Sequence, residues 1–202
     1  MTPSDLSTGR MNRLLEEYRQ GDERAINELL SAVMDRLFRL ARKMMRSYPI
    51  VRRWEESDDI LQNAVLRLTR ALQQTTPQDT RAFYGLAAEQ IRRELLDMAR
   101  RYRSQRGAGF EQAPMPSTDS GSGVVARAVA PADGYLDRWA AFHEAVDALP
   151  DDEREVFSLV FYHGWTQPQI AGLLDMNERT IRRYWRAACV RLCERLDGEM
   201  PA

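Results

Sequence analysis

The chain has 202 residues, an apolar fraction of 44% and a formal net charge of −1. This composition is typical of a globular protein with one or two hydrophobic cores. No run of about 18 apolar residues occurs, and the first residues, MTPSDLSTGR, lack the basic and then apolar order of a signal peptide. We therefore expect a cytoplasmic protein without a membrane span.

The formal net charge is near zero, but the charges are unevenly distributed: two basic regions are separated by an acidic one. Residues 10–106 hold 20 Lys and Arg against 14 Asp and Glu, whereas residues 107–153 hold 2 against 9. Residues 179–195 then hold six arginines and one acid. Two basic surfaces fit a protein that binds a polyanion at two sites, although two solvated helix faces would produce the same counts.

The first half of the chain has the three- and four-residue apolar periodicity of helices and no sustained strand alternation. Ser57, followed by two acids, is predicted to begin the third of these helices. Pro77 and its polar neighbours are predicted to end it. The four predicted helices cover approximately residues 14–18, 26–44, 57–71 and 81–103.

Residues 106–134 are rich in Gly, Ala, Pro and Ser and contain few large apolar residues. Such a segment cannot bury enough surface to offset its ordering entropy, so we predict a flexible linker. A second helical region follows, with a helix over 135–149 and another that begins at Pro150. The fold class predicted is all-α, with two small helical domains, at 10–105 and 135–197, joined by the linker.

The end of the second region has the pattern of a helix-turn-helix. Thr166 and Gln169 are spaced as a capping box, and a short turn through Asp175 leads to Asn177, a favourable N-cap. The helix that follows buries Ile181 and, at helical spacing, Trp185, Ala188 and Leu192. Its other face is polar and basic, which is typical of a helix that reads DNA, although an ordinary helical hairpin is the alternative. The candidate DNA-binding residues are Glu178, Arg179, Thr180, Arg182, Arg183 and Arg186.

Three segments resemble the extracytoplasmic-function sigma factors. LPDDEREVFSLVFYHGWTQPQIAGLLDMNERTIRRYWRAACVRL is similar to their region four, which recognises the −35 promoter element. SDDILQNAVLRLTRAL resembles the region-two segment that grips the clamp helices of the RNA polymerase β′ subunit. FYGLAAEQIRRELLDMARRYRSQR resembles the next helix, which binds the −10 element and stabilises the melted strand. The resemblance covers roughly residues 10–105 and 136–196, in the expected order.

The resemblance implies a sigma factor that binds core RNA polymerase, through the β′ clamp helices and the β flap, and promoter DNA. An anti-sigma factor or a regulatory kinase is a further expected partner. Many members carry an Arg-Asn pair at the position of Glu89-Gln90, so the −10 sequence preference is expected to differ. The implied polymerase-binding residues are Asp58, Asp59, Leu61, Gln62 and Asn63. The implied −10 residues are Thr75, Thr76, Gln78 and Asp79 in a loop and Gln90, Arg93, Asp97, Arg100 and Arg101 on the following helix; the −35 residues are those of the recognition helix.

Enzymatic activity is not expected, because the chain has no G-x-x-x-x-G-K, G-x-S-x-G or H-E-x-x-H motif. His143 and His163 are predicted to be packing residues. Together with Cys189 and Cys193, His163 provides too few ligands for a zinc site, so we expect no metal or cofactor. A helix-turn-helix regulator that acts without polymerase would leave the basic first half unexplained, and a protein scaffold would leave the arginine face unexplained. The chain ends at residue 202, so no additional C-terminal domain is expected.

Overall fold

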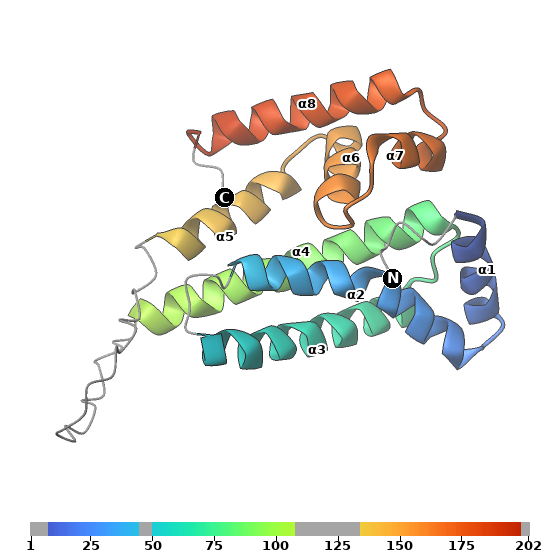
Figure 1. Ribbon diagram of the computed structural model, residues 1–202, viewed down its shortest axis with the longest axis horizontal. Coiled ribbons are helices and arrows are strands. Elements are labelled where there is room, and N and C mark those ends of the chain that lie inside the picture. The colour runs from blue at the N-terminus through green and yellow to red at the C-terminus, as the bar shows by residue number, and fades with distance from the viewer. Residues whose placement is uncertain (1–7, 45–49, 108–133, 199–202) are drawn as a thin grey trace, which may run out of the picture.

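The computed structural model describes residues 8–44, 50–107 and 134–198, and this part of the chain contains eight helices and no strand (Figure 1). The prediction of an all-α fold is therefore confirmed. The predicted linker, residues 106–134, lies outside the described residues except at its two ends. Residues 106 and 107 continue the preceding helix, and Gly134 is the N-cap of the next.

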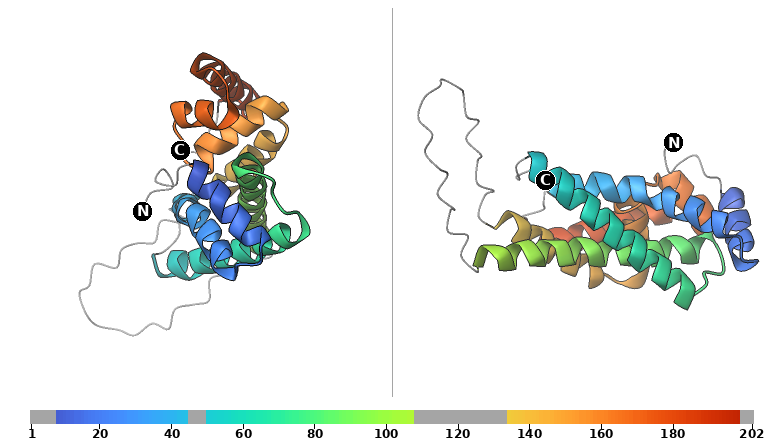
Figure 2. Two further views of the ribbon diagram at one scale, coloured as in Figure 1. Left: turned by 90° about the vertical axis from the view of Figure 1, so that its right-hand side faces the viewer. Right: turned by 90° about the horizontal axis from the view of Figure 1, so that it is seen from below.

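The first four helices form a bundle. They are α1 (Thr8–Arg19), α2 (Glu23–Met44), α3 (Ile50–Gln74) and α4 (Thr80–Gly107). Helices α2, α3 and α4 lie side by side, and α1 packs at one end (Figures 1 and 2). Each contributes apolar side chains at helical spacing to one interior, as the sequence periodicity predicts. The fully buried members include Leu15, Leu37, Leu68, Phe83 and Leu95.

The prediction that the third helix begins at Ser57 is wrong. Helix α3 begins at Ile50, so Ser57 and the two acids after it lie inside the helix. The seven residues before Ser57, IVRRWEE, include no glycine or proline, so nothing stops the helix from extending toward its N-terminus. The sequence has proline at position 49, which a helix interior would not tolerate.

The other four helices form a second, smaller unit. They are α5 (Tyr135–Asp147), α6 (Asp151–Phe161), α7 (Gln167–Leu174) and α8 (Glu178–Arg195). Pro150 is the N-cap of α6, and three acids occupy its first turn, where the helix dipole favours negative charge. Gly164 has a φ of 74°, which lets the chain turn sharply after α6. The interior of this unit includes Trp139, Phe142, Phe157, Ile181 and Leu192.

The two units pack directly on one another, which the sequence analysis did not predict. Helix α5 lies along α4, and the buried apolar residues of both units form one continuous core (Figures 1 and 2). Tyr84 of α4 makes edge contacts with the rings of His163 and Trp165, each at 4.8 Å between ring centroids. Arg36 of α2 donates two hydrogen bonds, of 3.1 and 2.9 Å, to the carbonyl oxygen of Phe161. Among the described helices, none combines the length and apolar character of a membrane span.

Candidate nucleic-acid interface

The predicted helix-turn-helix is present as α7, a short turn and α8. The Oε1 atom of Gln169 accepts hydrogen bonds from the backbone N–H and the hydroxyl of Thr166, at 2.9 and 2.8 Å, and so closes the start of α7. Asp175 ends α7 in the left-handed conformation, with a φ of 51°. Asn177 then begins α8, because its Oδ1 accepts the backbone N–H of Arg179 at 2.8 Å.

Helix α8 has one face in the core and one face in solvent. Ile181, Ala188 and Leu192 are buried, and Trp185 stacks on Phe157 with 5.3 Å between ring centroids. Since residues three, four and seven apart share a helix face, the predicted basic residues lie together on the opposite side. The exposed members are Arg179, Arg182, Arg183 and Arg186, whereas Glu178 and Thr180 are half-buried.

Contacts within α8 orient two of these arginines without covering them. Arg182 donates to the Glu178 carboxylate at 3.1 Å, and the Arg182 side chain stays 55% exposed. The guanidinium of Arg183 lies over the Tyr184 ring, 5.3 Å from its centroid. Exposed pairs of this kind contribute little stability, so a DNA phosphate could displace them at low cost. Helix α8 lies at the edge of the molecule away from α1–α4 (Figure 1).

The loop between α3 and α4 is anchored at its backbone. Arg19 of α1 donates to the carbonyl oxygen of Pro77 at 2.7 Å. The Asp79 carboxylate accepts the backbone N–H of Ala82 at 2.8 Å, so this member of the predicted −10 set caps α4. The other three members of the loop have exposed side chains: Thr75, Thr76 and Gln78.

The members of the predicted −10 set on α4 do not form one uniform surface. Gln90 is only 9% exposed, so it is not accessible in this arrangement. The loop and Arg100 are separated by 20 residues of helix, or roughly 30 Å, and would therefore contact different parts of a DNA site. The four charged members share one side of α4 and are all in ion pairs: Arg93 with Glu89, Asp97 with Arg67, Arg100 with Glu144, and Arg101 with Glu94.

A family model for ECF sigma factors matches residues 8–198, which include both helical units. The chain belongs to the extracytoplasmic-function sigma factor family. Members of this family act in the initiation of transcription. No curated protein matches the chain. Five solved chains match it; one belongs to a structure described as CnrH in complex with the cytosolic domain of CnrY. That match covers 94% of this chain and 99% of the other, with 20% identity and a TM-score of 0.39.

The predicted polymerase-binding residues of this sigma factor lie in α3. The side chains of Asp58, Asp59 and Leu61 are outside the described part of the structure. Gln62 is exposed and Asn63 is half-buried. The Asn63 side chain lies near Glu94 of α4 and helps to lower the pKa of that carboxyl, so its amide faces the bundle.

Glu94 is a buried carboxylate at the centre of an arginine cluster. It is 1% exposed and forms ion pairs with Arg67, at 2.9 Å, and with Arg101, at 3.2 Å. Burial raises its pKa, and the two arginines oppose that effect. Because an unpaired buried charge is costly, Glu94 holds Arg101 and Arg67 in place along the side of α4.

Both histidines of the sigma factor are buried packing residues, as predicted. His143 Nδ1 lies 2.8 Å from the Tyr162 hydroxyl, and His163 Nε2 lies 2.8 Å from the carbonyl oxygen of Tyr84. Burial lowers the pKa of His143 to about 3 and that of His163 to about 4. Within the described residues, no group of three or more His, Cys, Asp or Glu side chains could hold a metal ion.

Sequence reasoning missed the ion pairs that join the two units of this sigma factor. The acidic partners all come from α5 and α6, and the basic partners all come from α4. The signal was present in the charge balance, since a basic region of residues 10–106 precedes an acidic one at 107–153. By itself, that contrast indicates two basic surfaces for a polyanion, whereas the structure shows that the basic and acidic regions are complementary. The pairs are Arg81 with Glu155, Arg92 with Asp147, and Arg100 with Glu144.

Proposed function

We propose that this sigma factor binds core RNA polymerase and directs it to promoters by reading the −35 duplex with α8 and the −10 element with α4 and the preceding loop. The observation that carries the proposal is the exposed arginine face of α8, on a capped helix-turn-helix, in a chain matched by the sigma family over both units. The function is binding rather than bond-making. It therefore uses no cofactor.

At the −35 element, α8 would enter the major groove with its N-terminal half. Arg182 and Arg183 are exposed there, while Ile181 anchors the helix to the core. Guanidinium groups form bidentate bonds with guanine or bind phosphates, and the phosphate contacts make affinity salt-dependent. The buried face of α8 thus fixes the helix on the core, while its exposed face would contact the DNA.

At the −10 element, the loop and α4 would have separate tasks. The exposed side chains of Thr75, Thr76 and Gln78 offer hydrogen bonds to the edge of an unstacked base, and the anchored backbone limits the loop's freedom. Arg93, Arg100 and Arg101 would bind the phosphates of the melted strand farther along. Asp79 serves as the cap of α4 and so positions the loop.

The polymerase contact would lie on α3. Gln62 is exposed on this helix, and Asp58 and Asp59 precede it by one turn. The second unit would contact the β flap while α8 binds DNA. We place the protein in the cytoplasm with the polymerase, controlled by an anti-sigma factor or a regulatory kinase; affinity purification from the native host, with identification of the bound proteins, tests that partner.

Reconstituted transcription is the decisive experiment. Core polymerase alone does not start at a defined promoter, and addition of this protein is expected to produce initiation that depends on both promoter elements. A helix-turn-helix regulator that acts without polymerase would bind the DNA but would not start transcription. Absence of initiation on every promoter fragment from a randomised −35 and −10 library would contradict the proposal.

A further inference from the structure

Three arginines of α4 face the second unit and are neutralised by it. Arg81 forms a bidentate pair with Glu155, with N–O distances of 2.6 and 2.7 Å. Arg92 contacts Asp147 at 2.5 Å, and Arg100 contacts Glu144 at 2.7 Å. Positions 81 and 92 are 11 residues apart, close to three helical turns, so Arg81 and Arg92 are nearly in line along α4. Arg100 lies roughly 80° around the helix from Arg92, and its contact with Glu144 keeps it on the side that faces the second unit.

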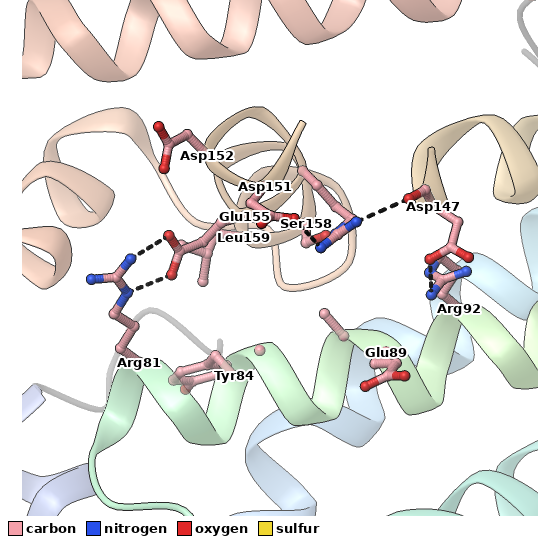
Figure 3. Close-up of a pocket in the computed structure, with 13 residues that line it drawn as sticks. Arg81, Tyr84, Glu89, Arg92, Asp147, Asp151, Asp152, Glu155, Ser158 and Leu159 are labelled. Carbon is pink, nitrogen blue, oxygen red and sulfur yellow. Dashed lines mark hydrogen bonds and ion pairs between the residues drawn. The ribbon is translucent and has the colours of Figure 1, made fainter. Parts of the chain in front are cut away.

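A cleft of about 440 Å³ lies between α4 and α6, and its arginines pair with acidic groups around it (Figure 3). The Arg81–Glu155 pair is at one end, and the Arg92–Asp147 pair is at the other. Arg154 donates to the carbonyl oxygen of Asp147 at 3.0 Å and to Asp151 at 2.6 Å. The arginines that line the cleft, Arg81, Arg92 and Arg154, are all paired, so the closed cleft is not a site for an added anion.

Of Arg81, Arg92 and Arg100, Arg92 is the one whose state depends most on docking. Its side chain is only 11% exposed, because the second unit covers it, and Asp147 supplies the opposite charge. A buried guanidinium without a partner is strongly unfavourable, so Arg92 needs either this carboxylate or solvent and another anion. Undocking of α5 and α6 would expose Arg92 and would free all three guanidinium groups from their carboxylates, spaced along roughly 28 Å of helix.

We propose that Arg81, Arg92 and Arg100 form a phosphate-binding row that Glu155, Asp147 and Glu144 hold closed in the free protein. The carboxylates occupy the positions that DNA phosphates take when the second unit undocks from α4. The proposal rests on the proposed function, because it assigns DNA as the anion, and it adds Arg81 and Arg92 to the DNA-binding residues. Docking and DNA binding then compete for the same guanidinium groups, which makes the contact autoinhibitory.

The test neutralises the three carboxylates in the full chain with substitutions that preserve size: Glu144→Gln, Asp147→Asn and Glu155→Gln. Small-angle X-ray scattering without DNA is expected to show a larger radius of gyration than for the parent. Affinity of the free protein for a promoter fragment with a single-stranded −10 region is expected to rise about tenfold. The slope of log affinity against log salt is expected to stay close to that of the parent, because DNA binding opens the parent to the same three phosphate contacts.

A control variant makes the same change in net charge at three exposed carboxylates that form none of these pairs: Asp35→Asn, Glu194→Gln and Asp197→Asn. It is expected to keep the parent's radius of gyration and salt slope. Addition of Arg81→Gln and Arg92→Gln to the opened variant is expected to remove its gain in affinity. Arg24→Gln, at an exposed arginine of α2, is expected to leave that gain in place.

Three results would overturn the inference. The opened variant could be as compact as the parent, or the charge control could gain as much DNA affinity as the opened variant. The gain in DNA affinity could also persist after Arg81 and Arg92 are replaced. All three are measured on the free protein. Initiation by the parent with core polymerase tests the proposed function separately. If the parent initiates transcription but the opened variant gains no DNA affinity, the inference about the arginine row is wrong and the proposed function is still supported.

Discussion

Acidification from about pH 7.5 to about pH 5 is expected to destabilise the protein through its two buried histidines. His163 donates its Nε2–H to the carbonyl oxygen of Tyr84, and Nδ1 is buried with no hydrogen-bond partner among the described residues, so the neutral ring is favoured. A proton on Nδ1 would place a charge in a buried site near Arg36, which also disfavours it. His143 is likewise buried, with Nε2 unpartnered in the described structure and Nδ1 beside the Tyr162 hydroxyl.

The sign and size of the effect follow from the pKa values. In the unfolded chain both histidines have a pKa of about 6.5, whereas in the folded protein the pKa is about 3 for His143 and about 4 for His163. Between these values the unfolded state binds more protons, so the free energy of unfolding falls as the pH drops below about 6.5. At about pH 5, 1.5 units below the unfolded value, each histidine costs about 2 kcal/mol.

Urea unfolding followed by circular dichroism at the two pH values measures this loss, about 4 kcal/mol for the pair. His163→Gln places an amide nitrogen where Nε2 lies, keeps a donor for the Tyr84 carbonyl and removes the titration. This variant is expected to lose about half of the pH dependence of the parent. His143→Asn, which places its amide where Nδ1 lies, is the matched variant for the other site and should remove the other half.

Two outcomes would refute the reasoning. A parent with equal stability at the two pH values would show that the histidines are not held neutral. A His163→Gln variant with the full pH dependence of the parent would show that other groups cause the loss. Glu94 does not cause it, because burial raises the pKa of its carboxyl and its protonation therefore stabilises the folded state as the pH falls.

Three further predictions concern function. Asp59→Arg combined with Gln62→Ala is expected to abolish binding to core polymerase in a pull-down while the helical circular dichroism is unchanged; retained binding would remove α3 from the interface. Arg182→Ala is expected to weaken binding of a −35 duplex by about 1–3 kcal/mol and to relax preference at one base pair, whereas Arg195→Ala, at the far end of α8, should change neither; equal affinities would mean that α8 is not the reading helix. Exchange of residues 73–80 for the loop of a relative with another −10 preference is expected to transfer that preference in initiation assays on randomised promoters, and an active graft with the original preference would exclude the loop from base reading.

Local sequence patterns were sufficient for the helices and for the helix-turn-helix. Capping depends on side chains within three residues of one another, so Thr166 with Gln169, and Asn177 with the start of α8, could be identified from spacing alone. The apolar periodicity likewise separates Ile181 from the arginines around it. The predicted start of α3 was wrong. Ser57 is a favourable cap in isolation, but the helix-forming residues before it extend the helix to Ile50.

Which charges meet depends on the packing of the helices. The amino-acid sequence is enough to establish that residues 10–106 are basic and residues 107–153 acidic, and it also establishes the inner and outer faces of α8, because both depend on composition or on neighbours in the chain. It did not determine that α5 lies along α4, since that packing joins residues more than 40 positions apart, such as Arg100 and Glu144. Contacts at such separation depend on how whole helices pack, and no local pattern encodes them. For the same reason the burial of Gln90 and Arg92, and the pairing of Glu94 with Arg101, became evident only once the helices were placed side by side.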